Sequence, residues 1–206
     1  YNVVVSGTAP CSSVTSDNTV LVVNQVVAIT TQPAVSQTIC SGSTVNFSVA
    51  ATGTGLSYQW RKGTTNLSDG GNITGATTAT LTISNAQTTD AAADYNVIVT
   101  GTAPCNPVPS DNAALVVYET VVITAQPITP QTVCSGENVT FSVAATGTGL
   151  TYQWRKGSTN LINGGNISGA DSPTLTITNA QPSDAAADYN VVVSGTAPCS
   201  SVTSDN

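Results

Sequence analysis

The chain has 206 residues, of which 40% are apolar, only 7% are charged and 5% are aromatic, and its formal net charge is −7. Four Lys and Arg residues cannot neutralise a run of phosphates or form a polybasic membrane anchor, so we expect no nucleic-acid partner. No apolar run approaches the roughly 18 residues of a membrane span, so we expect no membrane insertion.

The same composition argues against catalysis. There is no His, the commonest general base and metal ligand. Arg61-Lys62 and Arg155-Lys156 contain every cation of the chain, and we expect them on a solvated face. Asp90 and Asp94 stand at a predicted strand corner, where capping of the turn is the expected role. We therefore expect no enzyme, no catalytic residue, no metal site and no cofactor.

The surface predicted from this composition is neutral and rich in Thr, Ser, Asn, Gln and Gly. It offers few sites to trypsin-like proteases, and five cysteines are present. Because disulfides persist in oxidising compartments, the sequence predicts an extracellular or cell-surface location.

An internal repeat of 94 residues organises the whole chain. Cys11, Cys105 and Cys199 are spaced by this interval, and 45 of the 61 positions in 40–100 are identical to those in 134–194. Residues 1–18 recur letter for letter at 189–206. The pattern indicates a window on a longer array. A subunit that exchanges strands with its neighbour is the alternative, and the sequence leaves both open.

Within one unit the pattern is all-β. Apolar residues alternate with polar ones over 45–49, 56–60, 81–83 and 95–99, the period of a strand with one face on a core. The only helix-leaning run, 90–94, is too short for more than one turn. Several short strands in about 94 residues predict a sandwich of two sheets.

Three segments of the unit resemble an immunoglobulin-like domain: GSTVNFSV, LSYQWRKG and ATLTISNAQTTDAAADYNVIV. The likeness is strongest to the tandem immunoglobulin-like repeats of large Bacteroidota cell-surface adhesin and filament proteins. It implies an all-β fold of tandem immunoglobulin-like sandwiches. The implied domains are a partial unit at 1–23 with strands F and G, a complete domain at 24–117, and a domain at 118–206 that lacks its last strand.

The resemblance also implies a core, with one departure. The positions of the family's inter-sheet disulfide are taken by valines, so the core is expected to be aliphatic around its Trp. The expected core residues are Trp60, Trp154, Tyr95, Tyr189, Val49, Val97, Val143 and Val191.

The cysteines are therefore expected to form bonds elsewhere than between the two sheets of one domain. In this fold Cys40 lies near the start of strand B and Cys105 past the far end of strand F, about 26 Å away, whereas bridged Cα atoms lie within about 7 Å. We expect Cys40 to pair with Cys199 of the next unit, and Cys11, Cys105 and Cys134 to have partners outside the 206 residues. An intradomain Cys40–Cys105 pair on a bent loop, free thiols, or bonds between chains remain as alternatives.

The sequences of the junctions predict a stiff connection between neighbouring units. Residues 21–27 and 115–122 run between units without Pro or Gly, unlike a flexible linker. The sequence thus favours a structural segment of an extracellular filament or adhesin stalk, with neighbouring copies of the repeat as partners, head to tail and side by side. The alternative is an adhesin module that binds a glycan or protein through its loops.

Overall fold

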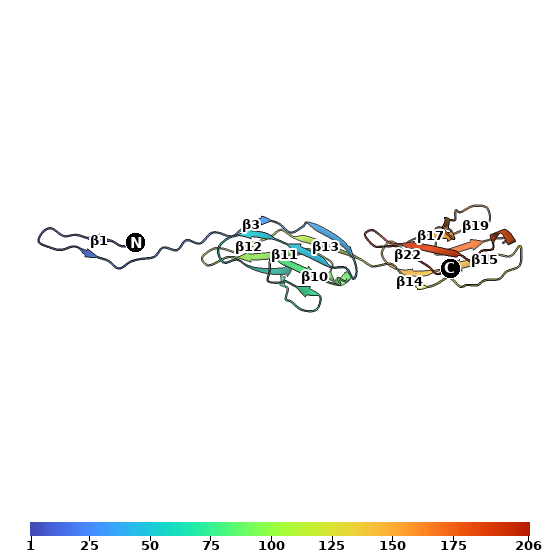
Figure 1. Ribbon diagram of the computed structural model, residues 1–206, viewed down its shortest axis with the longest axis horizontal. Coiled ribbons are helices and arrows are strands. Elements are labelled where there is room, and N and C mark those ends of the chain that lie inside the picture. The colour runs from blue at the N-terminus through green and yellow to red at the C-terminus, as the bar shows by residue number, and fades with distance from the viewer.

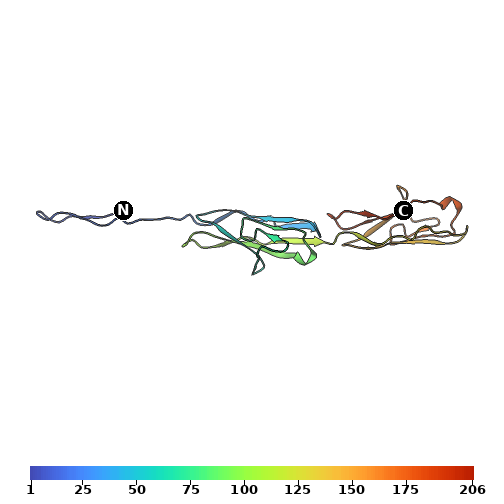
Figure 2. The ribbon, with the colours of Figure 1, turned by 60° about the horizontal axis from the view of Figure 1, so that its bottom comes forward.

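The computed structural model describes residues 1–206 as three parts in a row (Figure 1): an N-terminal hairpin and two sandwiches. Turning the molecule shows the same linear arrangement (Figure 2). The chain contains no α-helix, only the single-turn 3-10 helices η1 (Thr88–Asp90) and η2 (Pro182–Asp184). None of its helices has the length and apolar character needed to cross a bilayer.

The first sandwich has a large sheet in the order β4-β13-β11-β7-β8, with β12 beside β11. These strands are β4 (Ser36–Cys40), β7 (Ser57–Lys62), β8 (Thr65–Asn66), β11 (Ala92–Thr100), β12 (Val108–Pro109) and β13 (Ala113–Tyr118). Strand β13 is antiparallel to β11 and parallel to β4. The other layer has β5-β10-β9 and the pair β3-β6, with β3 (Ala28–Thr31), β5 (Val45–Ser48), β6 (Ala50–Thr52), β9 (Ile73–Thr74) and β10 (Thr80–Ile83).

Alternating side chains of the two layers meet in one core. The indole of Trp60 is fully buried and donates its Nε1–H to the Thr78 carbonyl at 2.9 Å. Val49 and Val97 are both buried beside it, so aliphatic packing fills the space. Each buried valine contributes on the order of 1.5–3 kcal/mol of transfer free energy. The second sandwich buries Trp154, Val143 and Val191 in the same way.

The corner before β11 corrects two sequence-based predictions. The single turn covers 88–90, whereas 92–94 belong to β11, so the helix-leaning alanines are mostly strand. Lys62, expected on a solvated face, ends β7 and donates from Nζ to the Thr89 and Asp90 carbonyls, because the η1 carbonyls face it. The Tyr95 hydroxyl also donates to the Asp90 carbonyl, at 2.6 Å.

The second sandwich repeats the first without the counterparts of β4 and β13. Its strands are β14 (Val122–Ala125), β15 (Val139–Ser142), β16 (Ala144–Thr146), β17 (Thr151–Lys156), β18 (Thr159–Asn160), β19 (Ile167–Ser168), β20 (Thr174–Ile177), β21 (Tyr189–Ser194) and β22 (Val202–Thr203). The sheets are β18-β17-β21-β22, β15-β20-β19 and the pair β14-β16. Nothing occupies the position of β13, so residues 130–134 form no strand. Tyr189, expected in the core, is only half-buried for the same reason.

The N-terminal part is a ribbon of β1 (Val4–Val5) and β2 (Val14–Thr15). Residues 1–23 were expected to supply strands F and G of a partial unit, and strand is found within them only at 4–5 and 14–15. Val20, Leu21, Val22 and Val23 are all exposed.

The Tyr95 phenol gives the first sandwich a measurable pH dependence. Burial raises the pKa of Tyr95 to about 12, and the nearby Asp90 and Asp94 carboxylates contribute to the rise. Above pH 10 the unfolded chain loses this proton and the folded chain keeps it, so the free energy of unfolding falls between pH 10 and about 12.

Tyr95→Phe should remove that fall, and at neutral pH it should cost about 0.5–1.5 kcal/mol for the lost hydrogen bond. Urea unfolding followed by Trp60 fluorescence measures both, in a Trp154→Phe background with Cys11, Cys105 and Cys134 replaced by Ser. An unchanged pH slope in Tyr95→Phe would contradict the assignment.

Candidate functional site: the junction between the sandwiches

A disulfide joins the two sandwiches. Cys40 is the last residue of β4, and Cys199 lies in the loop between β21 and β22. Their Cα atoms are 5.5 Å apart, and the bond spans 159 residues of sequence. Because Cys40 pairs with Tyr118 across the parallel β4–β13 ladder, the bond leaves the first sandwich beside the peptide that links it to the second.

The linking peptide is short and held from both sides. Only three residues separate the end of β13 at Tyr118 from the start of β14 at Val122. On one side, Ser41 N–H donates to the Tyr118 carbonyl at 2.8 Å, and Thr120 N–H donates to Ser41 Oγ at 3.2 Å. On the other side, Glu119 N–H donates to Thr148 Oγ1 at 2.9 Å. The backbone of the linker is therefore tied to both sandwiches.

The loop that carries Cys199 packs directly on this linker. A Cβ added at Gly195 would lie 2.8 Å from Val121 Cγ2 and 3.2 Å from the Thr148 carbonyl oxygen. A glycine is required at such an approach, because any larger residue would push the loop away. Val121 is itself buried against the second core. Through Val121, the linker therefore belongs to the second sandwich as well as connecting the two sandwiches.

The N-terminal end of the first sandwich has the same construction. Asn24 Nδ2 donates to the Ala103 carbonyl at 3.1 Å, and Gln25 N–H donates to Thr54 Oγ1 at 2.8 Å. A Cβ at Gly101 would meet Val27 Cγ2 at 2.7 Å. The loop that holds Cys105 therefore packs on Gln25 and Val27 as the Cys199 loop packs on the interdomain linker.

The remaining cysteines are thiols. Cys11 and Cys134 are exposed, and Cys105 is half-buried with its Sγ 3.6 Å from the Gln25 carbonyl oxygen. The structure thus brings together Cys40 and Cys199 and leaves the other three candidates apart from one another. Partners for them beyond the 206 residues stay a prediction.

Two of the charged residues singled out from the sequence, Asp90 and Arg61, lie in η1 and β7 of the first sandwich. No cluster of three or more His, Cys, Asp or Glu side chains could hold a metal ion. The Asp90 carboxylate accepts from Gln87 N–H and Asn72 Nδ2, which is the capping role expected for it. The Arg61-Lys62 pair is less solvated than predicted, since Arg61 Nε is buried without a hydrogen-bond partner.

The contacts of Ser41, Thr120 and Thr148 are not predicted by the sequence. The signal available is the TGTG motif at 52–55 and 146–149, which by itself indicates only a turn. Its second Thr hydroxyl accepts from the junction backbone in both sandwiches.

Residues 122–194 match the family described as immunoglobulin domain, and residues 29–119 match a family described as a domain of unknown function, DUF8696. Both sandwiches have the immunoglobulin-like fold. A comparison with characterised protein sequences gave no match.

Solved structures of tandem immunoglobulin domains resemble the chain. An I-band fragment of titin, I67–I69, is 20% identical with a TM-score of 0.63 over 86% of this chain and 63% of the fragment. Extracellular domains 3–5 of Drosophila OTK are 20% identical with a TM-score of 0.65 over 93% and 65%. Domains 1–4 of Sidekick-1 are 19% identical with a TM-score of 0.64 over 98% and 55%. The chain spans less than two thirds of these structures, and at such identities the likeness establishes the fold.

Tryptic mapping without reductant tests the disulfide directly. Because the cations stand only at Arg61-Lys62 and Arg155-Lys156, digestion separates Cys40, Cys105 and Cys199 into three different peptides. We expect the peptide 1–61 to be linked to the peptide 157–206, and the link to survive in Cys11→Ser.

The matched control is Cys40→Ser, which should release both peptides. In a Cys11→Ser, Cys134→Ser variant, a link between the peptides 1–61 and 63–155 would instead indicate a Cys40–Cys105 bond and contradict the interdomain pairing.

Proposed function

We propose that the chain is a load-bearing segment of an extracellular filament or adhesin stalk, built from stiffly joined immunoglobulin-like repeats. The observation that carries the proposal is the junction, where a three-residue linker, a packed loop and a disulfide act at the same point. Such a junction suppresses bending. The tandem immunoglobulin arrangement resembles that of the OTK and Sidekick-1 structures.

The surface and the sequence resemblance support the same proposal. A chain with so few charges presents Thr, Ser and Asn to solvent, which is compatible with copies lying side by side as well as head to tail. The resemblance to Bacteroidota repeats supports a bacterial cell surface as its location. Neighbouring copies of the repeat are the partners in this proposal.

The disulfide also defines a mechanical path. Tension applied to the two ends of the chain passes from Cys40 to Cys199 through the sulfur atoms, because the bond closes a loop of 159 residues. Most of both sandwiches lies inside that loop. An opened sandwich therefore adds no length to the oxidised chain beyond its terminal segments.

Single-molecule pulling from the two termini tests the load path. Since an extended residue spans about 3.3–3.6 Å, reduction of the bond across 159 residues should lengthen the fully stretched chain by about 550 Å. Cys40→Ser should extend like the reduced chain under oxidising conditions, whereas Cys11→Ser should stay short. Equal final lengths with and without reductant would contradict the proposed path.

A further inference from the structure

The loop between β18 and β19 stands out from the side of the second sandwich (Figure 1) and contains the only Asn-Gly pair of the sequence, Asn163-Gly164. Asn163 is exposed, and a Cβ added at Gly164 or Gly165 would meet nothing within 4 Å. In an Asn-Gly pair the backbone nitrogen of the glycine can attack the side-chain amide, because glycine has no Cβ to obstruct the approach. The loop therefore presents a chemically reactive pair to solvent.

The closed loop holds this pair in an unreactive arrangement. Asn163 Oδ1 accepts from Ala170 N–H at 2.8 Å, and Asn163 Nδ2 donates to Asp171 Oδ1 at 2.9 Å. The attacking nitrogen is also engaged, since Gly164 N–H donates to the Ile167 carbonyl at 2.9 Å. The side-chain amide cannot turn toward the nitrogen while these bonds are made. Reaction therefore requires that the loop opens.

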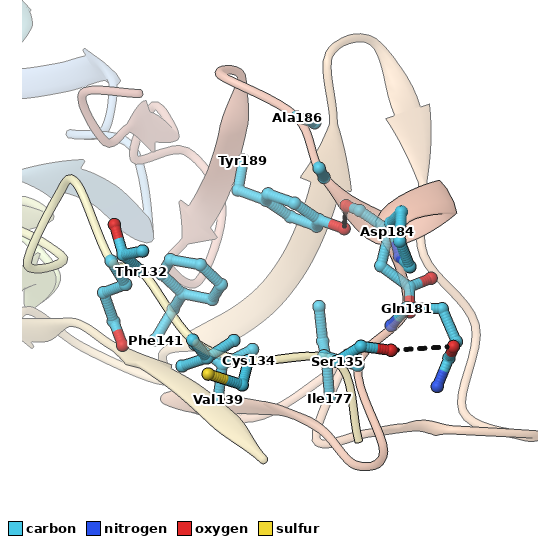
Figure 3. A pocket seen from close by; sticks show the side chains of 15 residues that line it. Thr132, Cys134, Ser135, Val139, Phe141, Ile177, Gln181, Asp184, Ala186 and Tyr189 are labelled. Carbon is cyan, nitrogen blue, oxygen red and sulfur yellow. Dashed lines mark hydrogen bonds between the residues drawn. The ribbon is translucent and has the colours of Figure 1, made fainter. Parts of the chain in front are cut away.

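The far end of the loop is anchored to the body of the sandwich. Asn166 Nδ2 donates to the Asp184 carboxylate at 2.9 Å, and Thr178 N–H donates to the Asn166 carbonyl at 2.8 Å. Asp184 is held in η2, where its carbonyl accepts from the Tyr189 hydroxyl at 2.7 Å (Figure 3). The tip at 163–165 can thus open while its surroundings stay in place, which requires less free energy than unfolding of the sandwich.

The first sandwich closes the same loop around a carboxylate. Asp69 takes the place of Asn163, and its Oδ1 accepts from Ala76 N–H at 2.7 Å. The residue opposite is Thr77, whereas the second sandwich has Asp171 at this position. In one loop an acid faces a neutral residue, and in the other an amide faces an acid. Each pair therefore contains a single carboxylate.

We propose that Asn163 is a deamidation site, and that its conversion to an acid keeps the loop open. In the open loop the Gly164 nitrogen attacks Asn163 Cγ. The N–Cγ bond forms, the Cγ–Nδ2 bond breaks, and the amide group leaves as ammonia with the proton of the Gly164 nitrogen. Water then opens the resulting succinimide ring at either carbonyl, which gives aspartate or isoaspartate. One water is consumed for each ammonia released, and no electrons are transferred.

The product differs from the amide in its contact with Asp171. The Nδ2 donor is replaced by an oxygen acceptor, so the hydrogen bond to Asp171 is lost and two carboxylates face each other. Reclosing of the loop is then disfavoured. Opening permits the reaction, and the reaction favours the open loop, so the change runs in one direction. The conversion adds one negative charge to a projecting loop and records how long that loop has been open.

Mass spectrometry of the tryptic peptide 157–206 tests the protection. This peptide contains Asn163 and, as an internal reference, Asn166, which precedes Ile167 rather than a glycine. At mildly alkaline pH, Asn163 should convert at least roughly tenfold more slowly in the folded chain than in urea, because the folded chain reacts only from the open loop. Equal rates in both states, or conversion in urea no faster than that of Asn166, would overturn the proposal.

Asp171→Thr tests the contact that holds the amide. The substitution copies Thr77 of the first sandwich and removes the acceptor of Asn163 Nδ2. It should raise the conversion rate in the folded chain roughly fivefold and leave the rate in urea unchanged. The matched control is Asp17→Thr, which removes a carboxylate from the N-terminal ribbon and should alter neither rate. An unchanged rate in folded Asp171→Thr would contradict the role of Asp171.

Hydrogen exchange of the Ala170 amide tests the effect of the product. Asn163→Asp should speed this exchange roughly fivefold, because the loop opens more often. In the Asp171→Thr background the same substitution should not speed it, since the carboxylate then faces Thr as Asp69 does. Equal acceleration in both backgrounds would overturn the charge repulsion. Circular dichroism checks that the variants are folded, and none of these measurements depends on assembly or on the Cys40–Cys199 bond.

Discussion

Three residues connect the two sandwiches, and their backbone groups are bound by side chains from both. This constraint fixes how one unit continues into the next, because neither the linker nor the loop that packs on it can move without breaking contacts in a core. Val121 belongs to the second core, and Ser41 to the end of the first. The Cys40–Cys199 disulfide adds a covalent restraint on the movement of the two sandwiches at the same point. Stacking of the units follows from this geometry.

The fold itself could be predicted from the sequence, because it depends on patterns with a strict period. Alternation around Trp60 and Val97 defined the buried faces, and the 94-residue interval defined the units. The replacement of the expected inter-sheet cysteines by Val49 and Val97 was also visible. Which side chains fill the core is a local property of each strand, so these residues can be recognised in the sequence.

The details of the junction and the corner could not be predicted in the same way. The contact of Thr148 with Glu119 joins residues of two different elements, and a hydroxyl in a turn gives no sign of its partner. Lys62 was misplaced because the carbonyls that bind it come from η1, 27 and 28 residues along the chain. The half-burial of Tyr189 depends on a strand beside it, which periodicity within β21 does not reveal.

A stiff, load-bearing array requires above all that the two sandwiches move as one body. Residual dipolar couplings of backbone amides in a weakly aligned sample measure this directly, because each sandwich reports its own alignment. We expect one alignment tensor, equal in magnitude and orientation, for residues 28–118 and 122–203. Tensors of clearly different magnitude in the oxidised chain would mean that the sandwiches pivot about the linker, and would contradict a rigid junction.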